Sequence, residues 1–212
     1  MNKKEKCRLC GSSADFCLNY LNKKYFRCRR CSAVFLSPAD YILSSDEKKR
    51  YLEHNNDVYD PGYQKFVEPI TAKVQEKFSK KAKGLDFGAG TGPVAAKLLE
   101  DRGYSIKLYD PFFWNNPQAL QEKYDFIICC ETIEHFHFPA KEFRLLRSLL
   151  KPKGVLFCMT DLYSEEINLK NWYYKNDPTH VFFYHKNSFQ WIKSKIGFST
   201  LNIEERLVQL LL

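Results

Sequence analysis

The nine residues Leu85–Pro93 constrain the fold more than any other stretch of the chain. The apolar entry that ends at Phe87 predicts the end of a buried strand, and the run Val94–Leu99 predicts a helix. Pro93 suits the first turn of that helix, where its missing N–H costs nothing. A strand, a glycine turn and a helix let a ligand approach backbone N–H groups at the positive end of the helix. The turn contains three glycines at alternating positions: Gly88, Gly90 and Gly92.

Two acidic residues near this turn narrow the class of ligand. The dinucleotide pattern G-x-G-x-x-G would need glycine where Pro93 stands, whereas D-x-G-x-G-x-G fits, with Asp86 two residues before Gly88. Asp110 ends the next apolar run, 24 positions after Asp86, where the tip of a second parallel strand is expected. A carboxylate at that point can accept hydrogen bonds from both hydroxyls of a ribose.

This segment resembles motif I and the ribose acid of class I S-adenosylmethionine-dependent methyltransferases. The resemblance implies an α/β, Rossmann-like sheet with an antiparallel last strand. It also implies that Asp86 faces the amino-acid end of the cofactor and that Asp110 holds the ribose. The remaining residues that we assign to S-adenosylmethionine are the loop under it and two neighbours: Gly88, Ala89, Gly90, Gly92, Phe112 and Cys130. A glycine turn in some other α/β domain is the alternative.

Composition limits the classes of protein to which the chain can belong. Its 212 residues can bury one core and a small appendage, and no run of 18 apolar residues is present to span a membrane. The charged N-terminus lacks the apolar stretch of a secretory signal, so we expect a cytoplasmic protein with reduced cysteines. Residues 1–36 carry nine Lys or Arg and two acids of a chain whose net charge is +8, so the basic character lies at the N-terminus.

Four N-terminal cysteines predict a zinc ribbon over residues 1–36. Two C-x-x-C pairs, separated by 17 residues, match a tetrahedral structural site: Cys7, Cys10, Cys28 and Cys31. A module of this size does not fold without its metal. Disulfides are the alternative, which a reducing compartment disfavours.

The role of this ribbon stays open between two classes of partner. Basic residues interleaved with aromatics can grip nucleic acid, namely Lys23, Lys24, Arg27, Arg29 and Arg30 around Tyr25 and Phe26. The same cations can balance four thiolates or form a solvated face. The layout also resembles sugar C-methyltransferases, which act on small molecules. We therefore favour a docking or substrate-covering module.

The sequence predicts a helical linking segment over residues 37–84. Ser44 or Ser45 can cap a helix over 46–52, and apolar spacing predicts a second helix over 66–78. In the resembling family such helices fold over the cofactor, which makes lid candidates of Tyr51, His54, Asn55, Tyr59 and Tyr63. Only 13 residues separate Asp110 from the next predicted strand, 124–130, so we expect the third strand of the sheet to be missing or vestigial. The adenine would then lie against Phe112 or a neighbouring aromatic.

Chemistry-bearing residues follow two of the predicted strands. If a helical turn begins after 124–130, its acids and imidazole share a face, and a later loop with Pro178 adds a second imidazole. The candidates are Glu131, Glu134, His135 and His180. A histidine can act as the base that removes the acceptor's proton. The pattern E-x-x-E-H with a later histidine also resembles ubiquinone-pathway O-methyltransferases and small-RNA 2′-O-methyltransferases. In the latter, two Glu and two His hold a divalent ion. We place His137 and His185 on the surface.

The C-terminal half matches the expected fold. Helices are predicted over 140–150 and 188–196, followed by a hairpin of 199–203 and 206–212 whose last strand enters the sheet antiparallel. We therefore divide the chain into a ribbon (1–36), a linking or lid segment (37–84) and a methyltransferase domain (85–212). The predicted function is methyl transfer to a small-molecule oxygen, carbon or nitrogen. The alternatives are an RNA 2′-O-methyltransferase and a non-catalytic cofactor-binding or interaction protein. The acceptor and the oligomeric state stay open.

Overall fold

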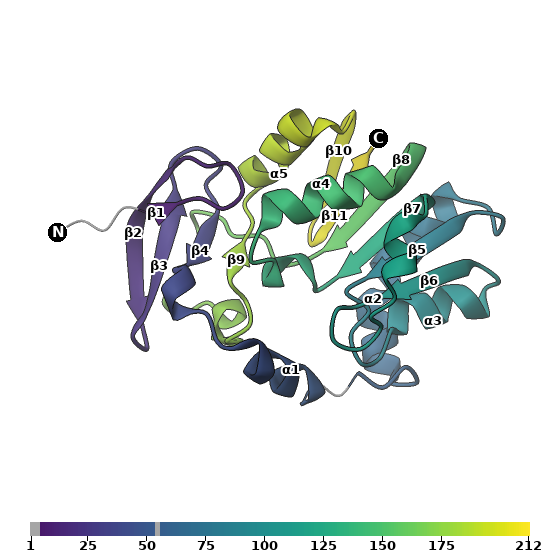
Figure 1. Cartoon of the computed structure of the whole chain (residues 1–212), viewed down its shortest axis with the longest axis horizontal. Helices are drawn as coiled ribbons and strands as arrows, with labels where there is room; N and C mark the ends of the chain where they lie inside the picture. Colours follow the sequence, from purple (N-terminus) through teal and green to yellow (C-terminus); the bar gives the residue numbers. More distant parts are fainter. Residues whose placement is uncertain (1–4, 54–55) are drawn as a thin grey trace.

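The computed structural model describes residues 5–53 and 56–212, which form two sheets that share a core (Figure 1). The larger sheet has six strands in the order β10-β11-β8-β7-β5-β6. Its parallel part consists of β6 (Ser105–Tyr109), β5 (Lys83–Phe87), β7 (Tyr124–Cys130) and β8 (Leu150–Met159). The antiparallel hairpin of β10 (Thr200–Glu204) and β11 (Leu207–Leu211) pairs with β8.

The centre of this sheet is apolar on both of its faces. The run Phe126–Cys129 in β7 is fully buried, as expected for a parallel strand covered by helices on either side. One side is packed by α2 (Pro61–Lys77) and α3 (Val94–Asp101). The other is packed by α4 (Pro139–Leu149) and by α5 (Lys186–Ile192), which continues into a π-helical turn, η5 (Lys193–Gly197).

The chain between β6 and β7 contains no strand in the described structure. It forms a short 3-10 helix, η2 (Pro117–Gln121), after a loop that bends back to pair Trp114 with Asp110. β6 is therefore the edge of the sheet, and the loop at its tip is free to contact the glycine turn.

The linking segment differs from its sequence prediction at two helix starts. The first helix, α1 (Ser44–Leu52), begins at Ser44 itself, with Leu43 before it and no side-chain cap. The second, α2, begins at Pro61 and not near residue 66, because the Asp60 carboxylate accepts a hydrogen bond from the N–H of Tyr63. A short 3-10 turn, η1 (Pro38–Asp40), precedes both helices.

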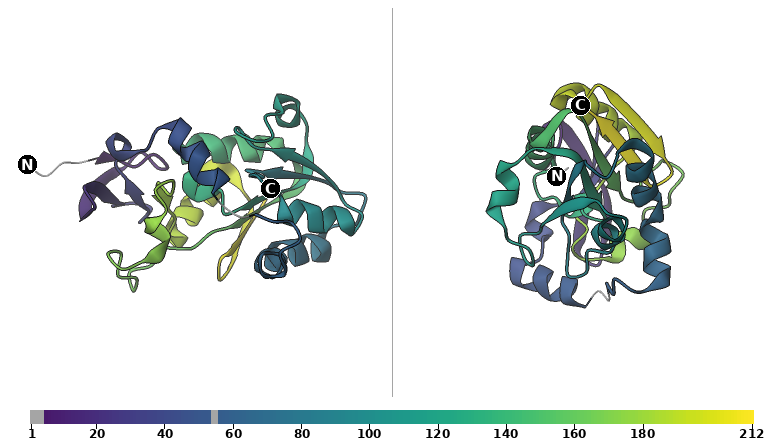
Figure 2. Two further views of the ribbon diagram at one scale, coloured as in Figure 1. Left: turned by 90° about the horizontal axis from the view of Figure 1, so that it is seen from below. Right: turned by 90° about the vertical axis from the view of Figure 1, so that its right-hand side faces the viewer.

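The small N-terminal sheet draws its last strand from the C-terminal half of the chain. Its order is β1 (Glu5–Lys6), β2 (Ser13–Tyr20), β3 (Lys23–Cys28), β4 (Val34–Leu36) and β9 (Phe182–Phe183), all antiparallel. Phe35 of β4 stacks on Phe182 with ring centroids 5.9 Å apart. Figures 1 and 2 place this sheet at the end of the molecule opposite α2 and α3. Residues 34–36 and 182–183 therefore make one continuous core between the two sheets.

Among the described residues, no helix has the length and apolar character needed to cross a bilayer.

Candidate active site

The glycine turn lies at the carboxyl end of β5 and is held by the tip of β6. The N–H groups of Gly88 and Ala89 donate to the Tyr109 carbonyl at 2.8 and 3.2 Å. Gly88 has φ +83°, and a Cβ there would lie 2.1 Å from Thr132 Cγ2. Only glycine meets both constraints, so this position is fixed by conformation and by close approach.

Asp110 ties the glycine turn to the loop that follows β6. Its Oδ2 accepts from the N–H of Gly90 at 3.1 Å, and its Oδ1 accepts from Phe112 and Phe113 at 2.8 and 3.1 Å. The indole of Trp114 donates to the Gly90 carbonyl at 2.8 Å, a contact that no pattern in the sequence predicts. The carboxylate proposed to hold the ribose is thus already part of a rigid frame.

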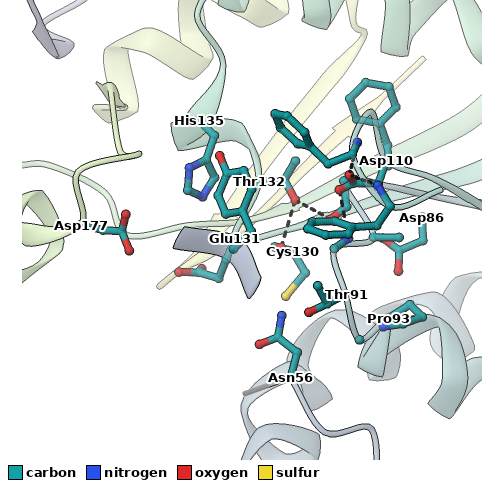
Figure 3. Close-up of a pocket in the computed structure, with 18 of the residues that line it drawn as sticks. Asn56, Asp86, Thr91, Pro93, Asp110, Cys130, Glu131, Thr132, His135 and Asp177 are labelled. Atoms are coloured by element: carbon teal, nitrogen blue, oxygen red, sulfur yellow. Dashed lines mark hydrogen bonds between the residues drawn. The ribbon is translucent and has the colours of Figure 1, made fainter. Parts of the chain in front are cut away.

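These residues line a pocket of about 1100 Å³ at the carboxyl edge of the sheet (Figure 3). All eight residues assigned from sequence to the cofactor lie on its wall: Asp86, Gly88, Ala89, Gly90, Gly92, Asp110, Phe112 and Cys130. Asp86 is buried, and this burial raises the pKa of its carboxyl to about 7, with a smaller contribution from the Asp110 charge. The pocket therefore has one half built from the glycine turn and its two acids.

The second half of the pocket is lined by three of the four predicted catalytic residues, Glu131, His135 and His180, but not in the predicted arrangement. Glu131 has φ +48° and precedes a 3-10 turn, η3 (Ile133–His135), so the expected helical face of 131, 134 and 135 is wrong. The strained turn directs Glu134 into the core, where it is fully buried, while His135 lines the pocket. A four-residue helical period cannot apply where the chain turns so sharply.

The Tyr174 hydroxyl lies between the two glutamates. It is 2.5 Å from Glu134 Oε1 and 3.1 Å from Glu131 Oε2. Thr160 donates to the other oxygen of Glu134 at 3.0 Å, and Arg206 donates to Glu131 at 2.9 Å. Neither Tyr174, Thr160 nor Arg206 was a candidate from sequence, because each comes from a separate segment.

Burial raises the pKa of both glutamates. The pKa of Glu131 rises to about 8, since desolvation and the nearby Glu134 charge outweigh the attraction of Arg206. The pKa of Glu134 rises to about 7 by desolvation, which the hydrogen bonds from Tyr174 and Thr160 oppose. Within the described residues, Glu131 Oε1 is buried without a hydrogen-bond partner. Such a carboxylate pair favours a shared proton or a bound cation.

Both histidines have Nδ1 within hydrogen-bond distance of a backbone carbonyl. His135 Nδ1 lies 3.0 Å from the Thr179 carbonyl, and His180 Nδ1 lies 2.7 Å from the Tyr174 carbonyl. A carbonyl can only accept, so each Nδ1 carries the proton and each neutral ring keeps a lone pair on Nε2. His180 Nε2 is 4.0 Å from Glu134 Oε1, and one ligand atom each of Glu134, His135 and His180 lie within 4.8 Å of one another.

The other two described histidines have structural surroundings. His185 is buried, and its ring accepts from Asn187 N at the start of α5, so its surface placement is wrong. The signal missed was its position directly before that helix. His137 is half-buried, and its Nε2 lies 3.0 Å from the carboxylate of Glu47.

The lid candidates divide into those on the pocket and those away from it. Tyr51 contacts both His135 and Phe112, with ring centroids 5.3 and 5.7 Å apart, and Tyr63 also lines the pocket. Tyr59 is exposed, and His54 and Asn55 lie outside the described residues. Asn56, not predicted, covers the glycine turn, and a Cβ on Gly92 would lie 1.7 Å from its carbonyl oxygen.

The four N-terminal cysteines form a separate cluster in the small sheet. Cys7 Sγ lies 3.6 Å from Cys31 Sγ, and Cys10 Sγ lies 3.3 Å from Cys28 Sγ. All four sulfurs are within 4.8 Å of one another, and no disulfide joins the described cysteines. The N–H groups of Arg30 and Cys31 point to Cys28 Sγ, as they do in knuckles that hold a thiolate.

Comparison with known proteins assigns the sequence to a family. A family model described as "Methyltransferase domain" matches residues 52–203. The chain belongs to this methyltransferase family. Membership assigns it to the S-adenosylmethionine-dependent methyltransferases.

The similar sequences carry a more specific name over a short span. The ubiquinone biosynthesis O-methyltransferases of Actinobacillus pleuropneumoniae and Serratia proteamaculans are 32% and 30% identical over 95 and 91 residues. Each match covers 43% of this chain and 41% or 38% of the relative. The methyltransferase thus spans about two fifths of the length of the curated relatives it matches.

A solved structure agrees over nearly the whole chain. It is the 1,6-didemethyltoxoflavin-N1-methyltransferase of Burkholderia thailandensis with 1,6-didemethyltoxoflavin and S-adenosylhomocysteine, at a TM-score of 0.57. The two chains are 14% identical, and the match covers 92% of this chain and 98% of the other. At this identity the likeness establishes the fold.

Proposed function

We propose that this protein transfers the methyl group of S-adenosylmethionine to a hydroxyl of a small molecule. The observation that carries the proposal is the meeting, in one pocket, of the glycine turn with Glu131, His135 and His180, while the buried Glu134 lies next to both histidines. The O-methyltransferase names of the similar sequences support oxygen as the acceptor atom.

The cofactor half of the pocket fits the two ends of S-adenosylmethionine. Asp110 offers its carboxylate to the ribose beside the backbone of the glycine turn, and Phe112 offers an aromatic face to the adenine. Asp86 lies where the charged amino-acid end is expected, and a cation there would return its pKa toward the ordinary range.

The acceptor half fits a divalent cation. Two imidazoles and one buried carboxylate, with one ligand atom each within 4.8 Å of one another, are a common ligand set for such ions. Glu134, His135 and His180 would hold the ion, with Glu131 next to them through Tyr174. A bound divalent cation lowers the pKa of a coordinated hydroxyl and orients it. Without an ion, either histidine can take the hydroxyl proton as a general base.

The cysteine cluster fits a structural zinc ion. A tetrahedral ion with Zn–S bonds of about 2.3 Å requires sulfurs about 3.8 Å apart, close to the separations of 3.3 and 3.6 Å. We propose that zinc stabilises the small sheet and that this module supports the acceptor side of the pocket.

A small molecule is a better-supported acceptor than RNA because two of the ribbon's five named cations are already paired with carboxylates. Arg27 forms an ion pair with Glu165, and Arg29 forms one with Asp15. Phosphate binding would have to break these pairs.

The decisive experiment follows methyl transfer from labelled S-adenosylmethionine to a panel of small hydroxylated compounds and to cell extract. Turnover should require Mg²⁺ or Mn²⁺, and Glu134→Gln and His180→Ala should lower it by at least 100-fold while S-adenosylhomocysteine still binds. Glu76→Gln, on the exposed face of α2, is the matched control. Full activity in EDTA, unchanged by added Mg²⁺ or Mn²⁺, would favour the histidine base. Full activity of both site variants would refute the assignment of the cluster.

A further inference from the structure

One carboxylate, that of Asp177, connects α1 to the segment that carries His180. Arg50 on α1 donates from Nε and Nη2 to Asp177 Oδ2 at 3.1 and 2.9 Å. The Asp177 side chain is only 13% exposed, so this ion pair is shielded from water more than the surface pairs of the chain. Figure 3 shows Asp177 on the same side of the pocket as His135, away from Asp86 and Asp110.

The second oxygen of Asp177 organises the backbone beneath the imidazoles. Its Oδ1 accepts from the N–H and the hydroxyl of Thr179 at 2.9 and 2.5 Å. The carbonyl of Thr179 is the acceptor for His135 Nδ1 at 3.0 Å. The N–H of His180 donates to the Asp177 carbonyl at 3.2 Å. A continuous path of hydrogen bonds therefore runs from Arg50 to both imidazole-bearing segments.

The direction of the Thr179 carbonyl has a chemical consequence at His135. While that carbonyl faces Nδ1, the proton stays on Nδ1 and the neutral ring has its lone pair on Nε2. If the Thr179 peptide turns, His135 loses its acceptor and the two neutral tautomers come closer in energy. Groups that fix the acceptor of an imidazole are known to change metal affinity by 10–100-fold.

We propose that Arg50 and Asp177 are positioning residues that hold His135 in the tautomer, and the backbone of His180 in the orientation, that the reaction needs. This inference rests on the proposed function, in which those imidazoles act on the acceptor. Under this proposal α1 does not only cover the pocket. Through Arg50 it also sets the positions of the imidazoles on the acceptor side.

The first test reads the imidazoles directly in zinc-loaded protein without other divalent ions. Long-range ¹H–¹⁵N spectra of histidine rings distinguish the two neutral tautomers. His135 in the wild type should give the Nδ1–H form alone. Asp177→Asn replaces two acceptor oxygens with one, so His135 should become a mixture of the two neutral tautomers. Arg50→Gln, at a side chain that is 35% exposed, should move it in the same direction by less.

The second test measures Mn²⁺ affinity by calorimetry in the presence of S-adenosylhomocysteine. Asp177→Asn should weaken Mn²⁺ binding by about 10-fold, the lower end for an outer-shell partner. S-adenosylhomocysteine affinity should stay within twofold. The double variant with Arg50→Gln should be no weaker than Asp177→Asn alone, because both changes break one path.

The matched control is Asp15→Asn, which breaks an Arg–Asp pair of similar geometry on the exposed face of the ribbon. It should change neither the His135 spectrum nor Mn²⁺ affinity. The proposal is overturned if Asp177→Asn keeps the single tautomer and binds Mn²⁺ within twofold of the wild type. If the wild type binds no Mn²⁺ but Asp177→Asn still shifts the tautomer, the metal assignment fails and the positioning role stands.

Discussion

At the scale of the residue, burial of Asp86 lowers the stability of the folded chain at neutral pH, while the same carboxylate is proposed to bind S-adenosylmethionine. Its pKa is about 7 in the folded chain against an ordinary value of 3.8, because burial disfavours the charged form. The folded state therefore binds the proton more tightly than the unfolded state between these two pH values. Stability contributed by this group is present at low pH and is lost as the pH rises toward 7.

Asp86→Asn should remove this dependence. The variant should gain thermal stability relative to the wild type between pH 5 and pH 8, while its affinity for S-adenosylmethionine falls. Unfolding scans at the two pH values, beside binding calorimetry, measure both effects. Asp101→Asn, an exposed acid paired with Lys97, is the control. A difference in melting temperature that is the same at both pH values would contradict the argument.

Asp110 holds backbone groups of the pocket in addition to its proposed contact with the ribose. Since it accepts three backbone N–H bonds, Asp110→Ala should loosen the glycine turn and weaken S-adenosylhomocysteine binding. The expected loss is about 1.5–3 kcal/mol, the range for a hydrogen bond to a charged group. Asp110→Asn keeps the shape and should lose less. Calorimetry that finds unchanged affinity in the alanine variant would place the ribose elsewhere.

At the scale of the element, the turn between β5 and α3 is set by backbone conformation and by its neighbour Thr132. Gly88 and Gly11 both have positive φ, +83° and +73°, but only Gly88 has a side chain against the place of its missing Cβ. A comparison of the two therefore separates strain from steric overlap.

Gly11→Ala should cost about 1–2 kcal/mol, the price of the left-handed conformation alone. Gly88→Ala should cost about 1–3 kcal/mol more, since a Cβ would meet Thr132 at 2.1 Å. Denaturant unfolding of the two variants measures the difference. Equal losses would mean that the Thr132 side chain moves aside easily.

At the scale of the whole molecule, the small sheet and the larger one are joined through β9. The N–H of Leu36 donates to the Val181 carbonyl at 2.9 Å, and the Ser188 hydroxyl donates to the Cys31 carbonyl at 2.9 Å. Loss of order around the cysteines should therefore reach the segment that holds His180.

Cys31→Ser should increase hydrogen exchange in peptides covering 179–186 as well as in residues 5–36, and should lower the zinc content from about one per chain. Cys17→Ser, at an exposed cysteine outside the cluster, is the control. Faster exchange confined to residues 5–36 would show that the two sheets are independent.

The sequence by itself determined the features that depend on local chemistry. The spacing of the three glycines and of Asp86 specified the turn between β5 and α3, because each requirement acts within a few residues along the chain. The cysteine spacing likewise specified a cluster of four sulfurs, and the family comparison agrees with the methyltransferase assignment.

Only the tertiary structure decided the surroundings of Glu131, Glu134 and the two histidines, His135 and His180. The positive φ of Glu131 broke the expected helical face, and Tyr174, Thr160 and Arg206 reached the glutamates from distant segments. The proton position on both imidazoles depends on backbone carbonyls 6 and 44 residues away in the chain. Hydrogen bonding and burial at this site are long-range properties, and no periodicity in the sequence encodes them.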